Sequence, residues 1–88
     1  MKTANIISIK QDLIKRIRQR RKEAKISQNT LAEKSGVSLG SVKRFEASGE
    51  ISLSSLLRIA FALGYESDFN SLFSHKSYNS IDEIINAK

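Results

Sequence analysis

The chain has 88 residues, no cysteine and a formal net charge of +6. This length suffices for one domain with one modest core, and the lack of cysteine excludes disulfides and thiolate metal sites. The single histidine, His75, cannot hold a metal alone, and no stretch approaches the roughly 20 apolar residues of a membrane span. We therefore expect a soluble, cytoplasmic protein without a metal or cofactor.

Positive charge is concentrated in the first part of the sequence. Residues 1–25 carry nine basic and two acidic side chains, whereas residues 26–88 carry six basic and seven acidic ones. Such a distribution is typical of a surface that faces a polyanion. A solvated helix face would show the same charge, so charge alone does not decide between the two.

Serines precede the stretches in which apolar residues recur at helical spacing, and a serine hydroxyl can accept hydrogen bonds from the amides of a first helical turn. Glycines follow three of these stretches, where helices commonly end. The predicted helices span about 9–25, 28–35, 39–47, 53–63 and 68–73, with a short one over 81–86. The serines are Ser8, Ser27, Ser38, Ser52, Ser67 and Ser80, and the glycines are Gly36, Gly49 and Gly64.

The apolar positions at helical spacing predict an inward face for each main helix, and hence an all-α fold of five helices around one core. Tyr65 is expected to fold back over the last turn of the fourth helix. The predicted inward residues are Leu13, Ile14, Ile17, Ala24, Val42, Phe45, Leu53, Leu56, Leu57, Ala60, Leu63, Phe69, Leu72 and Phe73.

The segment from Gln28 to Ala47 has the spacing of two short helices joined by a sharp turn. Ala32 is small where the two helices would meet, and Gly36 supplies the backbone conformation that the turn needs. Apolar residues around the turn would close a wedge between the helices, with a serine capping the second one. The alternative is a structural helical corner with solvated charges.

One face of the second helix of this pair is left without a packing role. Lys43 and Arg44 lie on it, and a helix fits the major groove of DNA, where a long basic side chain reaches guanine O6 and N7. Arg44 is therefore the first candidate for base reading. Lys43 is the second, or a phosphate contact.

The remaining candidates for DNA contact surround these two cations. Leu39 lies four residues before Lys43 and could pack on a thymine methyl, while Gly40 would permit close approach of the backbone. Ser38 and Ser41 belong to the same end of the helix. Gln28, at the start of the first helix of the pair, is placed to donate to a phosphate.

These residues make the sequence similar to the Cro/C1-type (lambda-repressor-like, XRE) helix-turn-helix regulators. The similarity runs from about Ile9 to Phe73 and includes the segments 27–28, 31–32, 36–38, 45–49 and 52–64. It implies a five-helix DNA-binding domain that acts as a two-fold dimer on a palindromic operator of double-stranded DNA, with half-sites about one DNA turn (~34 Å) apart.

A structural ion pair is predicted between Arg21 and Glu46. Arg21 follows Ile17 by four residues, which places it on the inward side of its helix, and Glu46 follows Val42 by four. A partly buried arginine needs a carboxylate partner, and the resemblance suggests the same pairing. We expect it to stabilise the fold rather than to contact DNA.

The loop at residues 47–50 departs from the family pattern. Relatives often carry basic phosphate contacts there, whereas this loop is neutral to acidic. Any phosphate contact from this loop should therefore come from backbone amides or Ser48. The basic first helix could compensate in part for the missing positive charge.

The sequence divides into a helix-turn-helix domain over residues 1–73 and an extension over 74–88. The extension could pack on its own body, on a second subunit or on another protein; the alternative is a frayed tail. Ser41–Glu46, Gly49–Leu53, Leu72–Phe73 and Ser80–Ile84 resemble antitoxins encoded beside Hip-type kinase toxins. This resemblance implies a repressor that also binds a kinase toxin. The alternative is a stand-alone or phage-type regulator, while no arrangement of residues suggests an enzyme.

Overall fold

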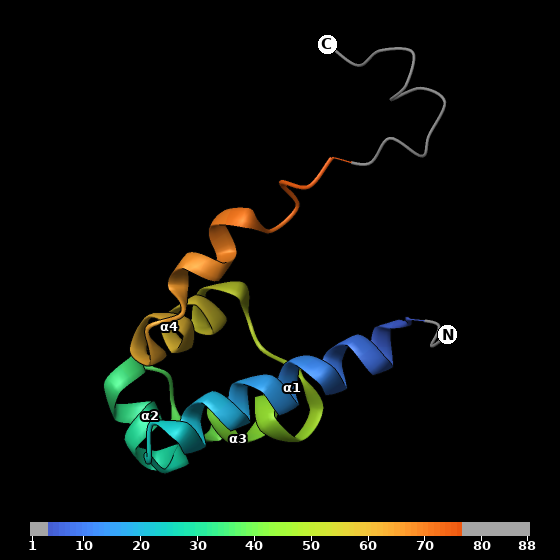
Figure 1. Cartoon of the computed structure of the whole chain (residues 1–88). Coiled ribbons are helices and arrows are strands. Elements are labelled where there is room, and N and C mark those ends of the chain that lie inside the picture. The colour runs from blue at the N-terminus through green and yellow to red at the C-terminus, as the bar shows by residue number, and fades with distance from the viewer. Residues whose placement is uncertain (1–3, 77–88) are drawn as a thin grey trace, which may run out of the picture.

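The computed structural model describes residues 4–76, and within that range every regular element is a helix (Figure 1). This confirms the predicted all-α fold of five helices, although the fifth is a 3-10 helix. The short helix predicted over 81–86 lies outside the described residues. The elements are α1 (Ile6–Glu23), α2 (Gln28–Ser35), α3 (Leu39–Ser48), α4 (Leu53–Leu63) and η1 (Glu66–Ser71).

Three of the predicted serine caps are confirmed. Ser27, Ser38 and Ser52 each accept a hydrogen bond from the backbone amide three residues later, at 3.0 to 3.1 Å. Each helix therefore begins where an exposed amide of its first turn finds a side-chain oxygen.

The caps predicted at Ser8 and Ser67 are wrong, and the cap predicted at Ser80 lies outside the described residues. Helix α1 begins earlier, because Asn5 caps it by accepting from the amide of Ser8 at 2.8 Å while the Ser8 hydroxyl accepts from the amide of Asn5 at 3.0 Å. Ser8 is thus the inner partner of a capping box instead of the cap itself. At η1 the capping position is held by Tyr65, without a side-chain bond, so Ser67 lies inside the helix.

The core forms where α2, α3 and α4 meet under α1. Leu31, Val42 and Ile59 are fully buried there, and Phe45 is nearly so. Gly36 closes α2 with φ +73°, a left-handed conformation that a Cβ would strain, and its amide donates to the Ala32 carbonyl at 3.0 Å. This turn sets α3 across α2 (Figure 1).

Four residues predicted to face inward are exposed instead. Leu53 is 65% exposed because the buried stripe of α4 is centred on Ile59 and Ala60, and the first turn lies at its margin. Phe73 is 96% exposed, since η1 ends at Ser71 and Phe73 has φ +62°. The other two are Ala24, which caps the end of α1, and Leu72.

Tyr65, which follows α4, contacts both α4 and α1. Its amide donates to the Ala60 carbonyl of α4 at 2.8 Å, and the guanidinium of Arg20 in α1 lies 5.9 Å from the centre of the Tyr65 ring. None of the helices within residues 4–76 has the length and apolar character needed to cross a bilayer.

The core assignment predicts different costs for two identical substitutions. Leu31→Ala should lower the free energy of unfolding by about 2–5 kcal/mol, because it removes a fully buried side chain and leaves a cavity. Leu53→Ala, at a position that is 65% exposed, should have a much smaller effect. Urea denaturation of both variants measures the difference, and equal losses would contradict this core.

Candidate nucleic-acid interface

Helix α3 is divided into a packed face and an open face. Val42, Phe45 and Glu46 are buried, whereas Lys43 and Arg44 are exposed. With 3.6 residues per turn, burial at positions 42, 45 and 46 fixes how the helix is rotated about its axis. The rotation therefore directs the two cations away from the protein.

In the part of the chain that the structure describes, the two residues predicted to read bases have no competing partner. Within residues 4–76, neither Lys43 nor Arg44 makes a side-chain hydrogen bond or an ion pair. Both charged groups are accordingly available to an external polyanion.

Among the other predicted contacts on α3, Ser38 and Leu39 are engaged within the protein, whereas Gly40 is open. The Ser38 hydroxyl donates to Ser41 Oγ at 2.9 Å and accepts from the Ser41 amide, so it serves the helix cap. Leu39 is half-buried and packs partly against the core. At Gly40 an added Cβ would meet nothing within 4 Å, so this part of α3 faces open space.

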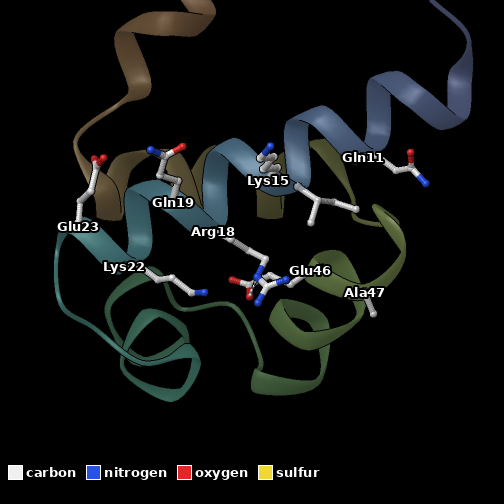
Figure 2. Close-up of a pocket in the computed structure, with 9 residues that line it drawn as sticks. Gln11, Lys15, Arg18, Gln19, Lys22, Glu23, Glu46 and Ala47 are labelled. Carbon is white, nitrogen blue, oxygen red and sulfur yellow. Dashed lines mark ion pairs between the residues drawn. The ribbon is translucent and has the colours of Figure 1, made fainter.

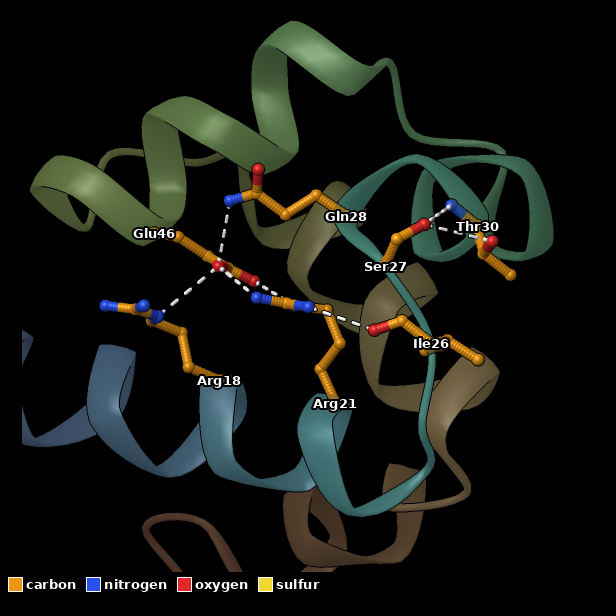
Figure 3. Close-up of polar contacts among 7 residues, drawn as sticks. All are labelled: Arg18, Arg21, Ile26, Ser27, Gln28, Thr30 and Glu46. Atoms are coloured by element: carbon orange, nitrogen blue, oxygen red, sulfur yellow. Dashed lines mark hydrogen bonds and ion pairs between the residues drawn. The ribbon is translucent and has the colours of Figure 1, made fainter.

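A buried carboxylate joins α1, α2 and α3 (Figure 3). Glu46 accepts from Arg21 Nε at 2.8 Å and from Arg21 Nη2 at 3.0 Å, and it accepts from Gln28 Nε2 at 2.9 Å. Arg21 also donates to the Ile26 carbonyl at 2.9 Å, and Arg18 Nε lies 3.6 Å from Glu46 Oε1. The structure thus brings the two residues of the predicted ion pair together and adds a further donor, Gln28, and a second nearby cation, Arg18.

Gln28 and Arg18 have roles in this cluster that the sequence pattern does not predict. The side-chain nitrogen of Gln28, a predicted phosphate contact, donates to Glu46, and a second N–H of the same group remains for an outside acceptor. Helical spacing could have indicated Arg18, because it lies three residues before Arg21 on the same side of α1.

The surroundings of Glu46 determine its ionisation. Burial disfavours the charged form and by itself would raise the pKa, but hydrogen bonds from Arg21 and Gln28 and the charges of Arg21 and Arg18 outweigh it. The pKa of Glu46 therefore lies below its ordinary value of 4.5. The carboxylate is charged at neutral pH.

The hydrogen-bond donors of the loop after α3 bond to acceptors within the loop and α3. The Ser48 hydroxyl donates to the Arg44 carbonyl at 2.8 Å, and the amides of Gly49 and Glu50 donate to the Phe45 carbonyl and Ser48 Oγ. Lys10 of α1 crosses over Gly49 and pairs with the Glu50 carboxylate, which lowers the pKa of Glu50. The Ser48 hydroxyl and these two amides are thus already bonded within the protein. They are the donors that the sequence predicts for phosphate contact.

An open groove of about 740 Å³ runs between α1 and α3 (Figure 2). Its α1 wall carries Lys15, Arg18 and Lys22, and its α3 wall carries Glu46 and Ala47. The cations of α1 thus lie beside the helix that presents Lys43 and Arg44.

Comparison with known families identifies the central part of the chain. A model of the helix-turn-helix family matches residues 17–70, more than half of the 88 residues. This range contains α2, the Gly36 turn and α3. Comparisons with curated proteins and with solved structures give no match.

The cluster predicts an acid-dependent stability. Because folding depresses the pKa of Glu46, the stability that this carboxylate contributes is fully present above its ordinary pKa of 4.5 and is lost as pH falls through the lower pKa of the folded state. Glu46→Gln should lower the melting temperature at pH 7 and flatten its decline below about pH 4.5. Thermal melts monitored by circular dichroism between pH 3 and 7 measure both.

Glu33→Gln is the matched control, since Glu33 is exposed on α2. It should leave the acid dependence close to that of the unmodified chain. An unchanged melting temperature for Glu46→Gln at pH 7 would refute a stabilising role for the cluster.

Proposed function

The chain belongs to the helix-turn-helix family and is a DNA-binding transcriptional regulator, and we propose that it is a sequence-specific repressor that reads operator bases with α3. The observation that carries the proposal is that Lys43 and Arg44 are exposed on α3, while Val42 and Phe45 on its opposite face are buried in the core. Bound at an operator, such a domain would occlude the transcription machinery.

The chemistry of α3 suits the major groove. An arginine can donate two hydrogen bonds to guanine O6 and N7, which distinguishes G·C from the other base pairs. Arg44 is assigned this role and Lys43 a base or phosphate contact. Ser41, Gly40 and the exposed part of Leu39 would lie along the same groove.

The start of α2 supplies a phosphate contact in this proposal. The amides of Gln28 and Asn29 have no partner within the described residues, since those of Thr30 and Leu31 are the first to bond to Ser27. Amides at a helix N-terminus attract anions. The remaining side-chain N–H of Gln28 would add a donor to the same phosphate.

A single domain offers few base-reading side chains, so we propose that two copies bind a palindromic operator. Two-fold dimers of helix-turn-helix domains place their recognition helices about one DNA turn apart, roughly 34 Å. The operator would then hold two inverted half-sites with that centre-to-centre spacing.

Replacing Arg44 provides the main test. Binding sequences are first selected from a random DNA pool, and we expect inverted half-sites about 10 base pairs apart. Arg44→Ala should then weaken binding to the selected site by about 1–3 kcal/mol and relax selectivity at one base position per half-site. Fluorescence anisotropy with all four bases at each position measures both.

Arg16→Ala serves as the control, because Arg16 is an exposed arginine of α1 on the flank away from α3. It should leave base preference intact. An equal loss for Arg44→Ala on selected and random DNA would contradict base reading and make Arg44 a phosphate ligand.

We further propose that the repressor is the antitoxin of a Hip-type kinase toxin and regulates its own operon. The support is the sequence resemblance of Ser41–Glu46, Gly49–Leu53, Leu72–Phe73 and Ser80–Ile84 to such antitoxins. The competing proposal, a stand-alone or phage-type regulator, shares the DNA-binding part and lacks the protein partner.

The partner distinguishes these two proposals. Affinity capture of the tagged full chain from its native cells should recover a larger protein with a kinase fold, encoded by the adjacent gene, in a complex that survives nuclease treatment. Recovery of the chain without that gene product, while operator binding is retained, would favour the stand-alone regulator.

A further inference from the structure

A row of three cations follows one flank of α1. Lys15, Arg18 and Lys22 are spaced by three and four residues, so they share a helix face, and all three are exposed. Figure 2 shows Arg18 and Lys22 directed toward the groove between α1 and α3. We call these three residues the α1 cation row.

Of the three residues in the α1 cation row, only Arg18 lies within ion-pair distance of an acidic residue in the described part of the chain, Glu46. Two acidic residues line the groove, and both are committed: Glu23 pairs with Arg20 at 3.0 Å, and Glu46 is bonded to Arg21 and Gln28. Within residues 4–76, Lys15 and Lys22 make no ion pair. Arg18 lies 3.6 Å from Glu46, farther than the roughly 2.8 Å of a charge-assisted hydrogen bond.

The loop after α3 has no free hydrogen-bond donor among Ser48 Oγ and the amides of Gly49 and Glu50 for a phosphate, whereas the α1 cation row could bind one. The Ser48 hydroxyl and the amides of Gly49 and Glu50 are bonded within the loop, and Lys10 is paired with Glu50. Contacts to the DNA backbone on this side of α3 must therefore come from another element.

The position of α1 meets this requirement. An α-helix with its side chains is about 10–12 Å across and fills a major groove about 12 Å wide. A helix packed beside it, with its axis roughly 8–10 Å away, lies over the wall of that groove, where the phosphates are. The α1 cation row lies on the flank of α1 that borders α3.

We propose that the groove between α1 and α3 binds the phosphodiester backbone of the same duplex that α3 enters, with Lys15, Arg18 and Lys22 as the contacts. This inference rests on the proposed DNA-binding function and extends its footprint to α1. The contacts carry no base information, so they strengthen binding to every sequence.

Salt dependence tests the inference, because each neutralised phosphate contributes about −0.9 to the slope of log affinity against log salt. The test compares Lys15→Gln/Lys22→Gln with Arg16→Gln/Lys34→Gln on a 30-base-pair duplex of random sequence. Both double variants remove two exposed positive charges from the chain, and Arg16 and Lys34 lie outside the groove. Arg18 is left intact because it joins the Glu46 cluster.

Loss of Lys15 and Lys22 should reduce the slope by about 1.8 for each bound protomer, so that the affinity falls about 12-fold less between 50 and 200 mM salt than for the unmodified chain. The control variant should keep the original slope, and the melting temperatures of both should stay unchanged. Equal slopes for the unmodified chain and Lys15→Gln/Lys22→Gln, or the same reduction in both double variants, would overturn the inference alone. Failure of the unmodified chain to bind any duplex would overturn the proposed function as well.

Discussion

The arrangement of α1, α2 and α3 depends on the hydrogen bonds that the buried Glu46 carboxylate accepts. A buried charge is costly unless it is paired and hydrogen-bonded, and here it accepts bonds from Arg21 of α1 and Gln28 of α2. Arg21 also holds the Ile26 carbonyl in the connection between those helices. Since each of these bonds has its own direction, the cluster sets the angles between helices more narrowly than apolar packing alone would.

The Glu46 cluster also determines which side of α3 would face DNA. Glu46 shares its face with Val42 and Phe45, so the same residues that bury the helix determine which side chains it presents. Lys43 and Arg44 need no partner of their own to be oriented. Fixing α3 in this way would favour the proposed recognition, because only the side-chain rotamers of Lys43 and Arg44, and not the helix that carries them, would lose conformational freedom on binding.

Much of the fold follows from local rules that the sequence displays. The ends of α2, α3 and α4 were predictable because each has a serine at its start and a glycine at its end. The Arg21–Glu46 contact could be inferred from spacing, since both residues lie four positions after an apolar one. Gln28 could not be placed in the same way: a polar residue at a helix start fits a phosphate contact and a bond to Glu46 equally well, and only the tertiary structure shows the latter. The exposure of Leu53 and Phe73 depended on where the buried stripe and the α-helical geometry end, which periodicity does not reveal.

The distribution of positive charge explains how an acidic loop is compatible with a DNA-binding surface. Glu50 would repel a nearby phosphate, but Lys10 pairs with it and brings α1 over the loop. One cation of α1 thus neutralises the loop, while Lys15, Arg18 and Lys22 continue along the flank that borders α3. The concentration of basic residues in the first 25 positions then has two separate physical roles. Arg21 and Lys10 pair with carboxylates within the fold, and in the proposed complex the remaining cations on the α3 side would provide the field that attracts a polyanion.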